Sequence, residues 1–137
     1  AEDGVAVDLV DGHASIAGYV PCGYVYVDGS SVGELTDADL KDRRILGDEG
    51  FVSVVIVVDL VGQKVVAGPD IHARGTAEDG DIFEEVVPMV RGAVEEALRR
   101  GVTDRYELSQ IARRTLGSWV GKKLRRKPMI VPMVVEV

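Results

Sequence analysis

Cysteine and histidine are scarce in this chain. Among its 137 residues there is one cysteine, Cys22, and there are two histidines, His13 and His72. A lone cysteine cannot form an internal disulfide, so we expect a reducing compartment. Metal-dependent hydrolysis needs several His, Asp or Cys ligands converging on one point, and no HxH, HxxxH or CxxC lies near either histidine. We therefore predict no catalytic residue, no metal ligand and no cofactor-binding residue in this chain.

Other functional signatures are missing as well. The sequence contains no GxGxxG, GxxxxGK[ST] or GxSxG motif. These motifs are the common sequence signals of phosphate-binding loops and nucleophile elbows, so the sequence indicates neither kind of site. Its densest apolar run, 51–60, is far shorter than the roughly 20 residues that a membrane-spanning helix needs. Apolar content of 46% and charged content of 28% are typical of a folded soluble protein and not of a disordered tail.

Charge is distributed unevenly. Residues 1–50 carry 11 Asp and Glu against 3 Lys and Arg, and residues 51–102 carry 9 against 5. Residues 103–137 reverse the balance, with 3 against 8. The net charge of −7 disfavours polyanion binding by the whole chain, while the basic C-terminal segment could attract a polyanion locally.

The run Phe51–Leu60 predicts the central strand of the fold. All of its residues except Ser53 and Asp59 are Phe, Val, Ile or Leu. β-branched residues pack well on a pleated surface, and a run with so little alternation is typical of a strand covered on at least one face. The turn Val61-Gly62-Gln63 then predicts a hairpin with Lys64–Ala67, and the chain passes through Gly68-Pro69-Asp70 to Ile71–Gly75.

Two amphipathic helices are predicted next. Apolar residues at helical spacing define one face of the first helix, in which Pro88 marks a start or a kink, and Gly101 ends it. Thr103 or Asp104 caps the second helix, and Trp119 lies on its apolar face. The apolar faces are Phe83, Val86, Val87, Val90, Val94, Ala97 and Leu98 in the first helix, and Leu108, Ile111, Ala112, Thr115, Trp119 and Val120 in the second.

The fold class predicted for residues 51–137 is α+β, as a two-layer β-β-α-α-β sandwich of a three-stranded sheet and two helices. Its third strand, Met129–Val137, could pair with either hairpin strand, and Pro132 predicts an edge position or a bulge there. Short apolar runs separated by Asp-Gly predict a β-meander over residues 1–29. A charged helix, Asp37–Leu46, capped by Thr36 and ended by 47–50, predicts a linker over residues 30–50.

Three surface features are candidate sites. The basic run that ends the second helix is either an RNA-contacting patch or a solvated helix end that complements the helix dipole. Its cations are Lys122, Lys123, Arg125, Arg126 and Lys127. The apolar last strand is a candidate self-association surface, through Met129, Val131, Met133, Val135 and Val137. Asp70, His72 and Arg74 share one strand face, as a small polar site or simply an outward polar face.

Several stretches together resemble the C-terminal part of the ribonuclease J family. They are Val20–Gly29, Leu40–Gly50, Gly68–Gly75 with its His72-Ala73-Arg74-Gly75 ending, and Arg126–Pro132. Each stretch alone is a weak signal, but they occur in the right order over nearly the whole chain. The resemblance implies a parent protein of the metallo-β-lactamase and β-CASP class. Enzymes of this family process RNA in the cytoplasm, and they use two zinc ions for 5′ exonuclease and endonuclease activity.

The resemblance implies a fragment rather than a complete enzyme. The zinc-binding motifs of the family lie upstream of the matched region, so none is carried onto a residue here. By resemblance, residues 1–29 are the last strands of the metallo-β-lactamase domain, 30–50 the linker, and 51–137 the C-terminal domain that supports homodimer assembly. The expected partners are a second copy, the remainder of the parent ribonuclease, and RNA through the parent. The alternative function is an accessory RNA-guiding module that uses residues 122–127.

Overall fold

The computed structural model describes residues 3–23, 27–28, 31–32, 36–77 and 80–137. The chain divides into two compact units, Ala1–Asp37 and Ala38–Val137, and each is described by itself. Part of the predicted run Tyr24–Val27 lies outside the described residues.

The first unit contains an antiparallel hairpin. Strand β1 (Val5–Val10) pairs with β2 (His13–Tyr19), and a two-residue turn with positive φ at both Asp11 and Gly12 joins them. Positive φ at both positions matches the right-handed twist of the flanking strands, which is why Asp-Gly predicted the turn. The two-residue strands β3 (Val27–Asp28) and β4 (Ser31–Val32) form a separate pair.

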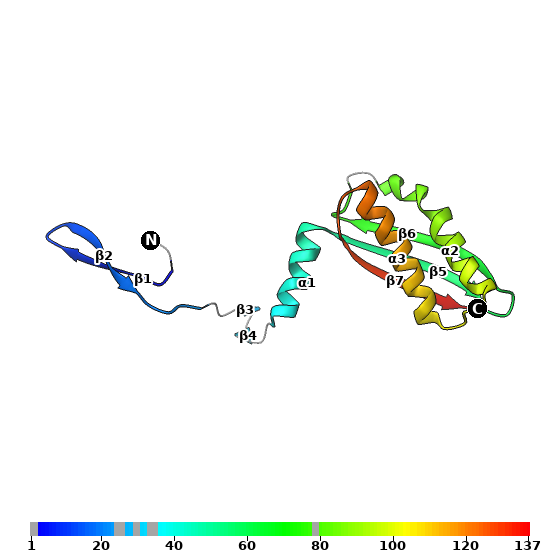
Figure 1. Ribbon diagram of the computed structural model, residues 1–137, viewed down its shortest axis with the longest axis horizontal. Coiled ribbons are helices and arrows are strands. Elements are labelled where there is room, and N and C mark those ends of the chain that lie inside the picture. Colours follow the sequence, from blue (N-terminus) through cyan, green and yellow to red (C-terminus); the bar gives the residue numbers. More distant parts are fainter. Residues whose placement is uncertain (1–2, 24–26, 29–30, 33–35, 78–79) are drawn as a thin grey trace. The chain divides into compact units, whose positions relative to one another are not determined.

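Helix α1 (Asp37–Asp48) belongs to the second unit except for its first residue, and it is longer than predicted (Figure 1). The sequence placed its end at Leu46, but Gly47 lies inside the helix. The backbone N–H groups of Glu49 and Gly50 both donate to the carbonyl of Ile45, and Gly50 has a φ of 90°. Gly50 is therefore the residue that turns the chain out of the helix.

A three-stranded sheet with strand order β6-β5-β7 forms one layer of the second unit. Strand β5 (Phe51–Asp59) is central, as predicted. It pairs antiparallel with β6 (Lys64–Arg74) and parallel with β7 (Met129–Glu136), which settles the partner that the sequence left open. Pro132 thus lies on an edge strand, where a missing N–H is tolerated.

Strand β6 forms the predicted antiparallel hairpin with β5 and contains a bulge that the sequence did not predict. It is one strand of 11 residues, and its pairing with β5 shifts register twice, between Val55 and Val57 and between Val57 and Val58. Gly68 has a φ of 80°, and the Gly68–Pro69 peptide bond is cis. A Cβ at Gly68 would come within 2.5 Å of the carbonyl oxygen of Val55, so the bulge requires glycine at this position.

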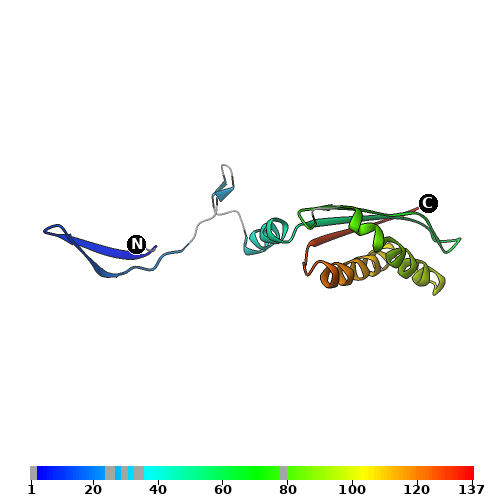
Figure 2. The ribbon, with the colours of Figure 1, turned by 90° about the horizontal axis from the view of Figure 1, so that it is seen from above.

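The second layer consists of two helices on one side of the sheet (Figure 2). A short 3-10 helix, η1 (Gly80–Glu85), leads into α2 (Val87–Arg99), which begins at Val87 with Pro88 in its first turn, so the proline marks the start of the helix and not a kink. Helix α3 (Arg105–Lys123) follows, and the Asp104 carboxylate caps it by accepting from the N–H of Tyr106. The two-layer α+β sandwich is confirmed, with 0% exposure for Val52, Val54 and Ile56.

Trp119 packs at the end of this core. Its side chain is 7% exposed, and its ring lies 5.6 Å from that of Phe83, centroid to centroid, at a tilt of 53°. The predicted burial of Trp119 is confirmed. Leu116, which the predicted helical face omitted, is fully buried.

Candidate functional site

One face of the sheet is apolar but is not covered by the helices. Along β7, Ile130 and Val134 pack against the core, whereas the alternate side chains point the other way. Val131, Met133 and Val135 are 41%, 56% and 40% exposed. Among residues 38–77 and 80–137, the helices α2 and α3 lie on the opposite side of the sheet (Figure 2).

The strand register extends this surface across the sheet. Met133 pairs with Val55 and Val135 pairs with Val57, and both partners on β5 are half-buried. We call the surface formed by Val55, Val57, Val131, Met133 and Val135 the open sheet face. It contains three of the five predicted self-association residues. Of the other two, Met129 is half-buried at the start of β7, and Val137, just beyond the strand, is exposed.

A polar strip borders the open sheet face on β6. Asp70 and His72 pair with Val55 and Ser53 of the central strand, and Arg74 pairs with Phe51, so the three side chains share that face. His72 Nε2 lies 3.1 Å from Asp70 Oδ2, and both side chains are about 70% exposed. Such exposure agrees with an outward polar face. In interfaces, an apolar centre with a polar rim is the usual arrangement.

Two cations of the predicted basic cluster have partners within the second unit. Lys123 pairs with Glu85, with Nζ 3.0 Å from Oε2. Arg126 donates from Nη1 to the carbonyls of Asp48 and Gly75, at 3.2 and 3.4 Å, and so ties the end of α1 to the end of β6. Lys122 and Arg125 are exposed. RNA contact by this cluster stays a prediction.

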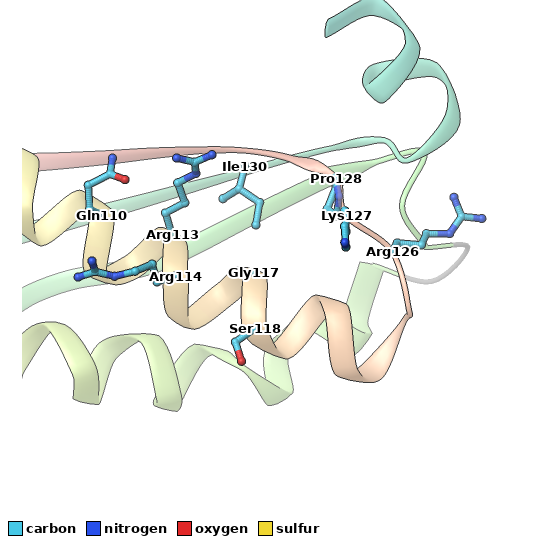
Figure 3. Close-up of a pocket in the computed structure, with 9 residues that line it drawn as sticks. All are labelled: Gln110, Arg113, Arg114, Gly117, Ser118, Arg126, Lys127, Pro128 and Ile130. Carbon is cyan, nitrogen blue, oxygen red and sulfur yellow. The ribbon is translucent and has the colours of Figure 1, made fainter. Parts of the chain in front are cut away.

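A hollow of about 340 Å³ lies between α3 and the start of β7 (Figure 3). We call it the α3–β7 groove. It brings the middle of α3 together with two members of the basic cluster, Arg126 and Lys127. Its lining residues are Gln110, Arg113, Arg114, Gly117, Ser118, Arg126, Lys127, Pro128 and Ile130. Sequence reasoning missed Arg113 and Arg114, although their position off the apolar face of α3 was a signal.

Nothing in the described part of the chain fits a catalytic metal. Across residues 3–23, 27–28, 31–32, 36–77 and 80–137, no three His, Cys, Asp or Glu residues come together as a metal site. The two zinc ions implied by the resemblance therefore have no ligand set among these residues. No helix in the same part of the chain has the length and apolarity to cross a membrane.

These features define a class of protein: a two-layer α+β domain with an apolar open face and a basic groove. The family model for the ribonuclease J C-terminal domain matches residues 39–137. The chain belongs to this family, and the resemblance seen in the sequence is confirmed. The match begins inside α1, and the domain boundaries predicted at residues 29 and 50 stay predictions.

Relatives named ribonuclease J align with nearly the whole of this chain. A protein named Ribonuclease J from Mycobacterium tuberculosis (strain CDC 1551 / Oshkosh) is 46% identical over 137 residues, covering 100% of this chain and 24% of the relative. Ribonuclease J from Mycolicibacterium smegmatis is also 46% identical, over 138 residues and with the same coverage. Ribonuclease J2 from Bacillus subtilis is 33% identical, covering 99% of this chain and 25% of the relative. The chain thus spans about a quarter of these relatives.

Proposed function

We propose that this chain acts as the C-terminal domain of a ribonuclease J-type RNA-processing enzyme and joins two copies of that enzyme through the open sheet face. The observation that carries the proposal is the exposure of Val131, Met133 and Val135 on a sheet whose helices cover the other side. Solvent-exposed apolar patches of this kind mark interaction sites. A two-fold contact would place the same patch on both copies.

Packing through the face is favoured over pairing through the edge of β7. Pro132 lies in the middle of β7 and has no N–H to offer. Since an edge-to-edge contact depends on a row of backbone donors and acceptors, the proline weakens such pairing. Face-to-face packing uses side chains instead, at a sheet separation of about 10 Å.

Catalysis in this proposal belongs to the remainder of the parent enzyme. The zinc ions, the exonuclease and endonuclease steps and the cytoplasmic location are all expected of that parent. The chain alone should not cleave RNA, because its described residues offer no convergent metal ligands. A nuclease-free preparation of the chain, incubated with labelled RNA and zinc, should leave the RNA intact. Zinc-dependent cleavage would contradict the proposed division of roles.

The test of assembly is the mass in solution at micromolar concentration, measured by light scattering or sedimentation. Met133→Lys places a charge at the centre of the open sheet face and should convert dimers to monomers. Met89→Lys is the matched control, because Met89 is similarly exposed, at 52% against 56%, but lies on α2. It should leave the mass unchanged.

The rival occupant of the open sheet face is another part of the parent enzyme within the same copy. In that case the unaltered chain would be a monomer, and neither Met133→Lys nor Val135→Lys would change its mass. This outcome would overturn assembly through the open sheet face. A standard interface buries about 800 Å² on each partner, an area that a sheet face of this size can supply.

A further inference from the structure

The α3–β7 groove is rich in cations that are not engaged elsewhere. From Arg105 to Lys127 the sequence has eight Lys and Arg residues and a single carboxylate, Glu107. Among the described residues, no hydrogen bond or ion pair involves the side chain of Arg113, Arg114 or Lys127. Elsewhere in the unit, arginines such as Arg91 and Arg99 are bonded to carbonyls or carboxylates. The groove therefore holds uncommitted positive charge.

The geometry of the groove leaves room for a ligand beside these cations. Gln110 and Arg113 extend from α3 toward β7, Ile130 lies between the two elements, and Lys127 stands at the far end (Figure 3). Arg126 points away from them, consistent with its bonds to Asp48 and Gly75. Gly117 keeps the hollow open, since a Cβ there would already lie 3.3 Å from Cδ1 of Ile130.

We propose that the α3–β7 groove binds the phosphate backbone of single-stranded RNA. Guanidinium groups match phosphate oxygens with paired N–H donors, and Gln110 adds a neutral donor beside them. The choice of RNA over another anion rests on the family to which the chain belongs. This site is independent of the open sheet face, so it stands or falls separately from assembly.

An exposed aromatic side chain lies on the same stripe of α3. Tyr106 precedes Gln110 by four residues and Arg113 by seven, a spacing that places all three along one side of a helix. Tyr106 is 71% exposed. It lies about 10 Å along the helix axis from Arg113. A base can therefore stack on Tyr106 while the neighbouring phosphates occupy the groove, the usual combination in single-strand binding.

The test is fluorescence anisotropy of a labelled 15-nucleotide oligouridine with the full 137-residue chain, titrated between 50 and 200 mM salt. Arg113→Ala/Arg114→Ala should weaken binding at least tenfold. It should also reduce the slope of log K against log salt by about 1.4, since each phosphate contact on a single strand contributes about 0.7. Tyr106→Ala should weaken binding about fivefold with the slope unchanged, because stacking releases no counterions.

The matched control is Arg44→Ala/Arg100→Ala, which removes the same charge from exposed positions on α1 and after α2. It should change the affinity less than twofold. Circular dichroism and solution mass of each variant separate lost binding from lost folding or assembly.

Four results would overturn the groove proposal. They are no RNA binding by the unaltered chain at 50 mM salt, equal losses in the groove and control variants, a loss confined to Lys122→Ala/Arg125→Ala, or binding of a polyglutamate peptide in preference to RNA.

Discussion

The two faces of the three-stranded sheet are built from similar residues but have different surroundings. Along β5, Val52, Val54, Ile56 and Val58 are fully buried under α2 and α3. The alternate residues are only half-buried, and three of them, Phe51, Val55 and Val57, are also apolar. The sequence of β5 thus places apolar residues on both faces of the sheet. Within the described unit, helices cover only one of these faces. This difference between the two faces is what motivates the proposed contact between copies through the open sheet face.

The largest loss of stability is expected from a substitution in the core, on the covered face of the sheet. Trp119→Ala removes a ring that is 7% exposed and packed against Phe83. The free energy of unfolding should fall by about 3–5 kcal/mol. Denaturant unfolding followed by circular dichroism measures it, and a loss below about 1 kcal/mol would show that the ring contributes little to this core.

A matched pair of substitutions measures the difference between the faces directly. Ile56→Ala on the covered face should lower the free energy of unfolding by about 2–5 kcal/mol, because it leaves a cavity. Met133→Ala on the open face should change it by less than about 0.5 kcal/mol when measured at a concentration where the chain is monomeric. Equal losses at the two positions would mean that the open face is covered even in the monomer.

The smallest effect is expected on the polar strip. Asp70→Asn removes the carboxylate charge beside His72, but both side chains are about 70% exposed and their interaction is screened by solvent. We expect a change in the free energy of unfolding below about 0.5 kcal/mol at neutral pH, in the same denaturant assay. A larger loss would indicate that the strip stabilises the sheet itself.

The elements that depend on local patterns could be predicted from the sequence. The central strand, the helical faces around Val90 and Leu108, the Asp104 cap and the stop at Gly101 all follow from periodicity or capping rules. The bulge in β6 could not, because Gly68-Pro69 is also the signal of a turn, and only pairing with β5 reveals a continuous strand.

The candidate sites divide in the same way. The exposed β7 residues follow from alternation, so Val131, Met133 and Val135 could be chosen from the sequence. The groove depends on tertiary structure. Arg113 and Arg114 look like ordinary solvated helix residues until the loop after α3 brings Lys127 to the same hollow. The run of adjacent basic residues also gave no sign that Lys123 and Arg126 bond to Glu85 and to the carbonyl of Asp48, because these contacts depend on tertiary structure.

The parallel pairing of β5 with β7 has a consequence for folding. Phe51 pairs with Met129, so one edge of the central strand finds its partner only after both helices have been traversed. Closing such a long loop costs conformational entropy before the hydrogen bonds between β5 and β7 can form. Non-local pairing of this kind slows folding. During synthesis, the hairpin of β5 and β6 forms first, with the edge of an almost wholly apolar strand unpaired until β7 arrives. In that interval the nascent domain is most exposed to aggregation.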